Sequence, residues 1–269
     1  MGGGALAAGA ATFGATRTMT PAKKTHHLTL GLASYTLRSF SLEEVIEMTK
    51  RVGLKHVAFK SMHMPLDSSE STIKSIVAKV RDAGLDLYGA GVIYMKSEAE
   101  VNNAFAYAKV AGLKVIIGVP NHDLLPLVER RVKETNIKLA IHNHGPGDKV
   151  YPSPDSVIEK VKGLDTRIGL CMDIGHTVRI GQDPAQKAKQ YADRLYDVHI
   201  KDVNKATKEG TPLEIGRGLI DIPKFLKTLE KIKYSGIVGF EYEKDGKDPL
   251  AGLAESVGYV KGVIRGMKS

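Results

Sequence analysis

The amino-acid sequence predicts an α/β protein that folds as a single (β/α)8 barrel. Short apolar runs alternate with amphipathic stretches from residue 28 to the end of the chain. Such an alternation is typical of parallel strands joined by right-handed helical crossovers. The chain of 269 residues holds eight of these units, and a closed eight-stranded barrel typically takes about 250 residues.

The expected strands are short apolar runs, many of them preceded by a glycine or a similar helix breaker. They lie near residues 28–33, 55–60, 86–92, 114–118, 138–142, 167–173, 195–200 and 236–241. An expected helix follows each strand, and the last helix covers "LAESVGYVKGVIRGMK". An open doubly wound sheet is the alternative, but it needs a glycine-rich phosphate loop after an early strand. The segment "GLASYTLRSF" is not such a loop, so the barrel is favoured.

The stretch "SLEEVIEMTKRVGLKHVAF" shows the repeating unit in full. Ser41 and Glu44 have the spacing of a capping box at the start of a helix. Val45 and Met48 mark one apolar face, and Gly53 stands where a glycine often ends a helix. The apolar run that follows is the second expected strand.

The first 25 residues differ from the rest, and we expect them to lie outside the fold. They are small and apolar, with no charge before Arg17. They resemble the apolar core and small-residue end of a bacterial export signal, particularly a twin-arginine signal, although the basic start is missing. A flexible Ala/Gly tail is the alternative. The expected barrel domain is therefore 26–269, in a protein that is periplasmic under the export interpretation and cytoplasmic otherwise.

The formal charge of +9 does not by itself indicate a nucleic-acid partner. The lysines are mixed with acids at helical spacing, for example in "VERRVKE" and "LKTLEKIK", which is typical of solvated helix faces. No run approaches the roughly 18 apolar residues of a membrane span. The single Cys171 excludes an internal disulfide, and nothing in the sequence predicts the oligomeric state.

Four strand-like runs end on residues that can bind a metal ion. The runs "KLAIHNHG", "IGLCMDIGH", "LYDVHIKDV" and "GIVGFEYE" carry His142, Asp173, His199 and Glu241. The carboxyl ends of barrel strands meet at one rim, so these side chains are expected to converge. Two imidazoles and two carboxylates suit one divalent ion such as Mn, Zn, Co or Fe, and they tolerate Mg. A hydrogen-bonded polar plug is the alternative, and Cys171 is either a further ligand or a packed thiol.

The ordered motifs "MDIGH", "DVHIKD", "GRGLIDIPKFLKTL" and "GFEYE" resemble the sugar phosphate isomerase/epimerase family, which has the xylose isomerase-like TIM-barrel fold. Its relatives include tagatose and psicose epimerases, hydroxypyruvate isomerase, inosose dehydratase and endonuclease IV. The resemblance spans roughly residues 28 to 269. It implies metal ligands at Asp173, His199 and Glu241, a substrate contact at His176, and an arginine that holds substrate oxygens at Arg217.

One position departs from this family. Its epimerase-type members carry a glutamate at the tip of strand five, which serves as a ligand and as an acid/base. Here that position is His142, which can bind metal but is a poorer match to a proton shuttle made of two carboxylates. His144, two residues on, is then a candidate second base or substrate contact.

The donor set and the resemblance together predict proton abstraction next to a carbonyl, through an enediolate. Glu241 is the first candidate base, followed by His176 and His144. Return of the proton elsewhere gives a sugar isomerase or epimerase, which is the expected activity. Loss of a β-substituent instead gives a lyase or dehydratase acting on a keto-sugar, for example a 3-keto-glycoside.

Further polar residues are expected around the substrate. Lys60 and His63 follow strand two in "FKSMHMP", and Lys201 shares the strand alternation of His199. Tyr35, after strand one, is a candidate pocket wall. A solvated surface lysine is the alternative for Lys60.

Two other classes of protein share parts of this pattern. An endonuclease IV-type nuclease builds a trinuclear zinc site with ligands from most strands, whereas the exits of strands three and four here offer only His122 and Asp123. No basic stripe with interleaved aromatic residues points to nucleic acid. A sugar-binding barrel without catalysis stays open because of His142. The expected partner is a small-molecule sugar or keto-sugar.

Overall fold

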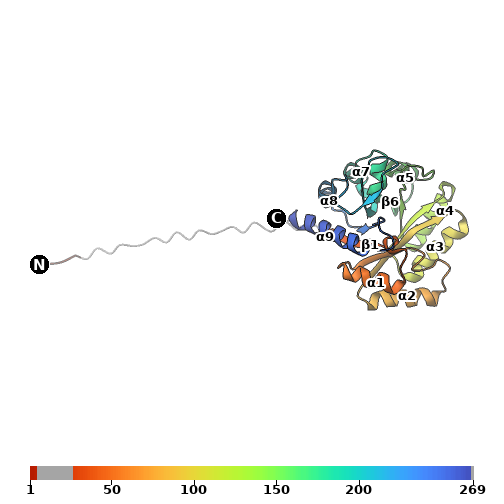
Figure 1. Cartoon of the computed structure of the whole chain (residues 1–269), viewed down its shortest axis with the longest axis horizontal. Coiled ribbons are helices and arrows are strands. Elements are labelled where there is room, and N and C mark those ends of the chain that lie inside the picture. The colour runs from red at the N-terminus through yellow and green to blue at the C-terminus, as the bar shows by residue number, and fades with distance from the viewer. Residues whose placement is uncertain (5–26, 268–269) are drawn as a thin grey trace.

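The computed structural model describes residues 1–4 and 27–267 of the chain. Eight parallel strands close into a barrel, and helices surround it (Figure 1). The order around the ring is β1, β10, β7, β6, β5, β4, β3 and β2. The expected (β/α)8 barrel is thus confirmed. The expectation of a tail or export signal at residues 1–25 falls mostly on residues 5–26, which lie outside the described residues.

The barrel strands run close to the predicted apolar runs. They are β1 (Thr29–Ala33), β2 (His56–Phe59), β3 (Asp86–Met95), β4 (Val115–Pro120), β5 (Lys138–His142), β6 (Ile168–Asp173), β7 (Leu195–Ile200) and β10 (Ile237–Phe240). An antiparallel ribbon of β8 (Asp202–Val203) and β9 (Pro212–Leu213) follows β7. The sequence did not predict this ribbon, because strands of two residues are too short to show an alternating pattern.

Strand β3 ends later than predicted because it is irregular. Its register against β4 shifts between Ala90 and Ile93. A Cβ atom at Gly91 would lie 2.2 Å from the Ile117 carbonyl oxygen of β4, so this close approach requires glycine. Because of this irregularity, the end of the strand cannot be predicted from periodicity. The longer strand places Tyr94 at the carboxyl rim of the barrel.

The helices cover the outer face of the barrel (Figure 1). They are α1 (Leu42–Arg51), α2 (Glu70–Asp82), α3 (Glu98–Ala111), α4 (Leu125–Thr135), α5 (Pro154–Val161), α6 (Ile174–Arg179), α7 (Pro184–Gln190), α8 (Ile222–Lys231) and α9 (Leu250–Gly266), with short 3-10 helices η1 (Ser34–Leu37), η2 (His122–Leu124) and η3 (Ala192–Arg194). Within the described parts of the chain, no helix is long and apolar enough to cross a lipid bilayer.

Helix α1 begins with the predicted capping box. The Ser41 hydroxyl accepts a hydrogen bond from the Glu44 backbone, and the Glu44 carboxylate accepts one from the Ser41 backbone at 2.7 Å. These bonds satisfy two of the donors that the start of a helix leaves free. Gly53, one residue past the C-cap, has a φ of 71°, which favours glycine. Both ends of this helix therefore follow from the local sequence.

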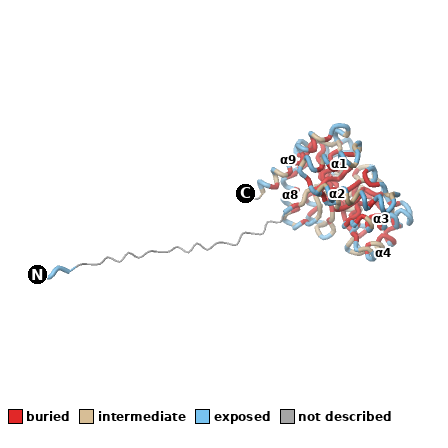
Figure 2. The backbone as a smooth tube through the Cα atoms, turned by 90° about the horizontal axis from the view of Figure 1, so that it is seen from below, coloured by how far each residue is buried: buried red, intermediate tan, exposed pale blue. Residues whose placement is uncertain are grey.

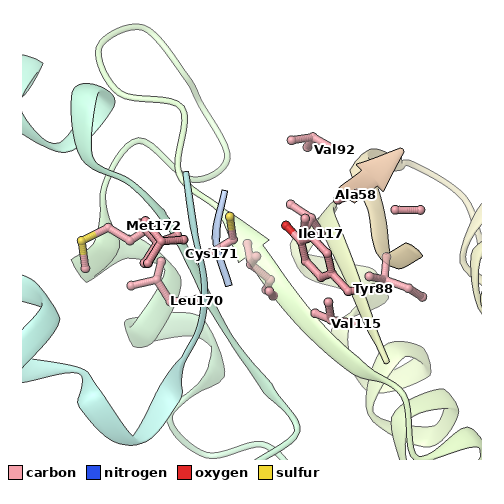
Figure 3. Close-up of a cluster of buried hydrophobic side chains, with 14 of the residues drawn as sticks. Ala58, Tyr88, Val92, Val115, Ile117, Leu170, Cys171 and Met172 are labelled. Carbon is pink, nitrogen blue, oxygen red and sulfur yellow. The ribbon is translucent and has the colours of Figure 1, made fainter. Parts of the chain in front are cut away.

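Buried residues line the strands and the inner faces of the helices, whereas the outer faces are exposed (Figure 2). On β6, Leu170 and Met172 project from one face and Cys171 from the other, toward the interior that also holds Tyr88 (Figure 3). Successive side chains on a strand point to opposite faces. Asp173, the last residue of β6, therefore shares the inner face with Cys171, as the sequence predicts.

Candidate metal centre

Four neighbouring strands of the ring carry the four predicted metal ligands to one level of the barrel. His142 ends β5, Asp173 ends β6, His199 lies in β7, and Glu241 directly follows β10. The parallel register pairs Asp173 with His199 across β6 and β7. Each of the four residues is at most 6% exposed. Burying polar groups raises the free energy of the folded chain unless these groups are paired with one another or with an ion.

The ligand atoms of these four residues converge. One nitrogen or oxygen from each lies within 4.8 Å of all the others. The Nδ1 atom of His199 is 3.0 Å from both His142 Nε2 and Glu241 Oε2. His142 Nε2 is 3.5 Å from Asp173 Oδ2, which belongs to a fully buried residue. This mixed nitrogen and oxygen set fits a divalent ion such as Mn, Zn, Co or Fe.

Lys201 reaches into the same cluster. Its Nζ atom lies 3.0 Å from Asp173 Oδ2, 2.9 Å from Glu241 Oε2 and 2.9 Å from Glu243 Oε2. The lysine is only 5% exposed. An ammonium group so placed neutralises part of the negative charge that the buried carboxylates bring to the centre.

The charges of the cluster determine its protonation. Burial alone would raise the pKa values of Asp173 and Glu241, but the nearby histidines and Lys201 hold both well below their ordinary values. Burial would lower the pKa of Lys201, yet the three carboxylates hold it well above its ordinary value. Burial lowers the pKa of His142 well below its usual range. The centre at neutral pH therefore contains ionised carboxylates, an ammonium and a neutral imidazole at His142.

A cavity of about 330 Å³ opens above this cluster at the carboxyl ends of the strands. Barrel enzymes place their active sites at this rim. The residues around the cavity are mostly polar and include five of the predicted substrate or acid/base residues. The lining residues are Tyr35, Lys60, Val92, Tyr94, His142, His144, His176, Lys201, Glu241 and Glu243.

His144 and His176 form one side of the cavity. The ring of His144 is 4.4 Å from that of His142 and stacks on Tyr94 at 5.6 Å. Its Nε2 atom is 3.0 Å from the Tyr94 hydroxyl. His176 Nε2 lies 4.0 Å from Asp173 Oδ2, and burial lowers the pKa of His176 to about 4. Burial also lowers the pKa of His144, so both imidazoles are neutral at pH 7 and are weak bases.

Lys60 also lines the cavity, from the end of β2. Its ammonium donates a hydrogen bond to the Val92 carbonyl and lies 5.4 Å from the centre of the Tyr94 ring. Burial lowers the pKa of Lys60, although the charge of Glu241 acts in the opposite direction. This half-buried lysine therefore contributes a positive charge to the wall of the cavity.

Two predicted substrate contacts lie away from the cavity wall. His63 is 4% exposed, with Nδ1 2.8 Å from Ser34 Oγ and Nε2 3.2 Å from the Phe40 carbonyl oxygen. Arg217 donates from Nη2 to Glu255 Oε2 at 2.7 Å, and its side chain is 62% exposed. In this structure His63 supports the loops beneath the rim and Arg217 pairs with α9. Their roles toward substrate stay predictions.

Three residues in or next to the site were not predicted from the sequence. Glu243 lies two positions after Glu241, and the alternation in "FEYE" was a signal that could have found it. Tyr94 gave no signal, because the irregular stretch of β3 precedes it. Asp197 lies two residues before His199 on the same inner face, fully buried and 3.8 Å from the Cys171 sulfur.

These observations define a (β/α)8 barrel with a buried cluster of four candidate metal ligands beneath a polar cavity. A family model described as "Xylose isomerase-like TIM barrel" matches residues 122–263, more than half of the chain. The chain belongs to this family, and the resemblance found in the sequence motifs is confirmed.

Curated relatives match about half of the chain. The rhizopine catabolism protein MocC of Rhizobium meliloti is 29% identical over an alignment of 156 residues, and the match covers 48% of this chain and 47% of MocC. Inosose dehydratase of Clostridium perfringens is 28% identical over an alignment of 148 residues, and the match covers 48% of this chain and 49% of the dehydratase. The chain thus spans about half the length of the curated relatives it matches.

Solved structures share the fold over most of the chain. The IolI protein with a bound zinc atom has a TM-score of 0.74 at 16% identity, covering 89% of this chain and 99% of IolI. L-ribulose 3-epimerase has a TM-score of 0.72 at 15% identity, covering 89% of this chain and 95% of the epimerase. The family is therefore one of enzymes that includes epimerases and dehydratases.

Proposed function

We propose that the chain is a metal-dependent enzyme that removes a proton next to the carbonyl of a sugar or keto-sugar. The observation that carries this proposal is the convergence of four buried donors, His142, Asp173, His199 and Glu241, beneath a polar cavity. One divalent ion (Mn, Zn, Co, Fe or Mg) held there supplies a Lewis acid that polarises a carbonyl and offsets the negative charge created by deprotonation.

Glu241 is the first choice for the base, because it belongs to the donor cluster and also lines the cavity. Burial would raise its pKa, but His199 and Lys201 outweigh burial and keep the carboxylate ionised. A carboxylate with a lowered pKa is a weak base. Glu241 can therefore deprotonate only a carbon made acidic by a polarised neighbouring carbonyl, which suits a keto-sugar.

The second proton transfer is assigned to Tyr94 and His144. Their hydrogen-bonding atoms are 3.0 Å apart. They come from β3 and from the loop after β5, whereas Glu241 follows β10. The phenol gives its proton to the substrate and regains one from Nε2 of the neutral imidazole, whose Nδ1 atom takes up a proton in turn. This pair takes the part that a glutamate at the position of His142 would play in a two-carboxylate shuttle.

The destination of the second proton separates two activities. Protonation of a carbon by the Tyr94–His144 pair gives isomerisation or epimerisation, which is our first proposal and the chemistry named for the structural neighbour L-ribulose 3-epimerase. Protonation of a departing β-hydroxyl releases water and leaves a dehydrated ketone. This second candidate is supported by the matched inosose dehydratases and by the histidine at position 142.

The donor clusters give no support to a nuclease. The two candidate clusters found among the described residues share His142 and His199, so they mark a single centre. His122, predicted near the exit of β4, donates a hydrogen bond from Nε2 to the Val150 carbonyl oxygen, 3.0 Å away, instead of joining that centre. A trinuclear site would need further ligands on other strands.

The test combines metal analysis with solvent deuterium exchange. The purified chain is loaded with Mn, Zn, Co, Fe or Mg and incubated in D2O with a panel of ketoses, inososes and 3-keto-glycosides. We expect one ion per chain and exchange at the carbon next to the carbonyl, with removal of the ion abolishing exchange. Mass loss of one water identifies the lyase. The proposal is contradicted if the purified chain binds none of these ions and catalyses no deuterium exchange into any compound of the panel. Binding of a sugar without exchange identifies a sugar-binding barrel without catalysis.

A further inference from the structure

We propose that Lys201 is a built-in competitor for the metal ion, and that the ion binds only when the ammonium leaves the cluster and moves onto Glu243. The inference deepens the proposed function and rests on its metal centre. The Lys201 Nζ atom lies 3.0 Å from Asp173 Oδ2 and 2.9 Å from Glu241 Oε2. Two of the four candidate ligands are thus already engaged by a cation that belongs to the chain.

The contested oxygens are the ones that face the imidazoles. Asp173 Oδ2 is the oxygen 3.5 Å from His142 Nε2. Glu241 Oε2 is the oxygen 3.0 Å from His199 Nδ1. The ammonium therefore does not use spare lone pairs on the far side of the carboxylates. It contacts the same atoms that the donor cluster directs at one point.

An ion and the ammonium cannot share these oxygens at low cost. A divalent ion sits about 2.0–2.2 Å from a carboxylate oxygen, and Nζ lies 3.0 Å from Asp173 Oδ2. The two cations would therefore be no more than about 5 Å apart. Lys201 is 5% exposed, and repulsion between cations is weakly screened at a buried site. Binding of the ion must displace the ammonium.

Glu243 provides the place to which the ammonium can go. Its Oε2 atom is 2.9 Å from Nζ, yet Glu243 is not one of the four converging ligands. Its side chain is 28% exposed and lines the cavity. The ammonium of lysine sits on a flexible four-carbon stem, so rotation about the outer bonds can move the ammonium while the inner part of the side chain stays in place. On Glu243 the ammonium would face the cavity instead of the centre.

The start of α6 is shaped to accept the stem of this lysine. A Cβ atom at Gly175 would lie 3.0 Å from Lys201 Cβ and 3.4 Å from Lys201 Cδ. A larger residue at position 175 would push the stem away from Asp173. The glycine of the "MDIGH" motif thus leaves the space through which Lys201 reaches the cluster.

Two states follow from this arrangement. Without the ion, the ammonium compensates buried carboxylates that would otherwise be unpaired, which is costly. With the ion, Lys201 pairs with Glu243 and presents a cation to substrate oxygens in the cavity. Since binding linkage is reciprocal, a ligand that draws the ammonium into the cavity also strengthens binding of the ion.

The test measures the affinity of the full chain for Co²⁺ and Mn²⁺ by calorimetry and by the visible spectrum of Co²⁺. Lys201→Met keeps the stem and removes the charge, and it is expected to bind Co²⁺ at least tenfold more tightly than the unaltered chain. Glu243→Gln removes the alternative partner and is expected to bind Co²⁺ more weakly. Lys244→Met is the matched control, since it removes a charge paired with Glu214 outside the donor cluster, and should change affinity less than twofold.

Each outcome separates this inference from the metal centre itself. The competition by Lys201 is rejected if Lys201→Met binds Co²⁺ as tightly as the unaltered chain or more weakly. That result does not contradict metal binding at the centre. If neither the unaltered chain nor any variant binds Co²⁺ or Mn²⁺, both the competition by Lys201 and the proposed metal centre are rejected. If Lys201→Met does not fold, acylation of Lys201 in the unaltered chain is followed by mass spectrometry. Labelling should rise when Mn²⁺ is added, and unchanged or reduced labelling rejects the movement.

Discussion

At the residue scale, the two carboxylate oxygens of Asp173 have different partners. Its Oδ1 atom accepts a hydrogen bond from the His176 backbone at 2.8 Å and caps α6. Its Oδ2 atom lies in the donor cluster, near His142 and Lys201. The sequence shows an acid between a strand and a helix, which is compatible with either role. Only the packed structure shows that one side chain makes both sets of contacts.

The substitution Asp173→Asn should separate these roles. Asparagine caps a helix about as well as aspartate, so α6 should persist, whereas a neutral amide is a poor ligand for a divalent ion. We expect the affinity for Co²⁺, measured by calorimetry, to fall at least about 100-fold. Asp183→Asn, at the N-cap of α7, is the matched control. Equal affinity losses in the two variants would show that the metal is not bound at Asp173.

The substitution Tyr94→Phe tests the assignment of the second proton transfer. It removes the hydroxyl that faces His144 and keeps the stacked ring. Turnover to product should fall about 10²–10⁴-fold, the usual range for loss of an acid or base. Deuterium exchange at the carbon next to the carbonyl should continue, because Glu241 is unaltered. Tyr259→Phe on α9 is the control, and parallel loss of exchange and product would remove Tyr94 from this role.

At the scale of elements, local chemistry determines where regular helices begin and end. The capping box of α1 and the glycine after it are visible as a spacing of Ser41, Glu44 and Gly53. In β3 the corresponding boundary depends on contact with β4 at Gly91. Periodicity cannot reveal such a contact, since the partner strand lies elsewhere in the sequence. The same irregular strand supplies Tyr94, which explains why this site residue was missed.

The substitution Ser41→Ala measures the contribution of the capping box. It removes the acceptor for the Glu44 backbone at the start of α1. The free energy of unfolding should fall by about 1 kcal/mol, as for other capping serines. Urea unfolding followed by circular dichroism checks this. Ser61→Ala, at an exposed position outside the helices, should leave stability within about 0.5 kcal/mol, and an equal loss there would argue against a capping effect.

At the scale of the whole molecule, closing the barrel buries ionisable groups from distant parts of the chain. Asp197 is fully buried inside the ring, 3.9 Å from His199 Nε2 and 3.8 Å from the Cys171 sulfur. Burial raises the pKa of Asp197 to about 7 from 3.8. The local sequence around Asp197 resembles that of any strand acid, so only closure of the sheet accounts for this shift.

This raised pKa makes stability depend on pH in a defined direction. The folded chain keeps a proton on Asp197 that the unfolded chain releases near its ordinary pKa of 3.8. The stabilisation is fully present below that value and is lost as pH rises through about 7. Between pH 4 and pH 8 the free energy of unfolding of the unaltered chain should fall by up to about 4 kcal/mol relative to that of Asp197→Asn.

Denaturant titrations at several pH values check this difference. Asp193→Asn, at an exposed position just before β7, serves as the control and should follow the unaltered chain at every pH. A constant offset between Asp197→Asn and the unaltered chain would mean that Asp197 does not titrate over this range.

The sequence by itself determined the alternation of eight strands and helices, the cap of α1, and the four polar residues at strand ends. These are properties of periodicity and of residue types at chain positions, and parallel strands bring their carboxyl ends to one rim by topology alone. Only the tertiary structure decided that Lys201 and Glu243 join the donor cluster, that Tyr94 meets His144, and that Arg217 pairs with Glu255. Those contacts depend on side-chain reach and on the irregular register of β3, which no linear pattern records.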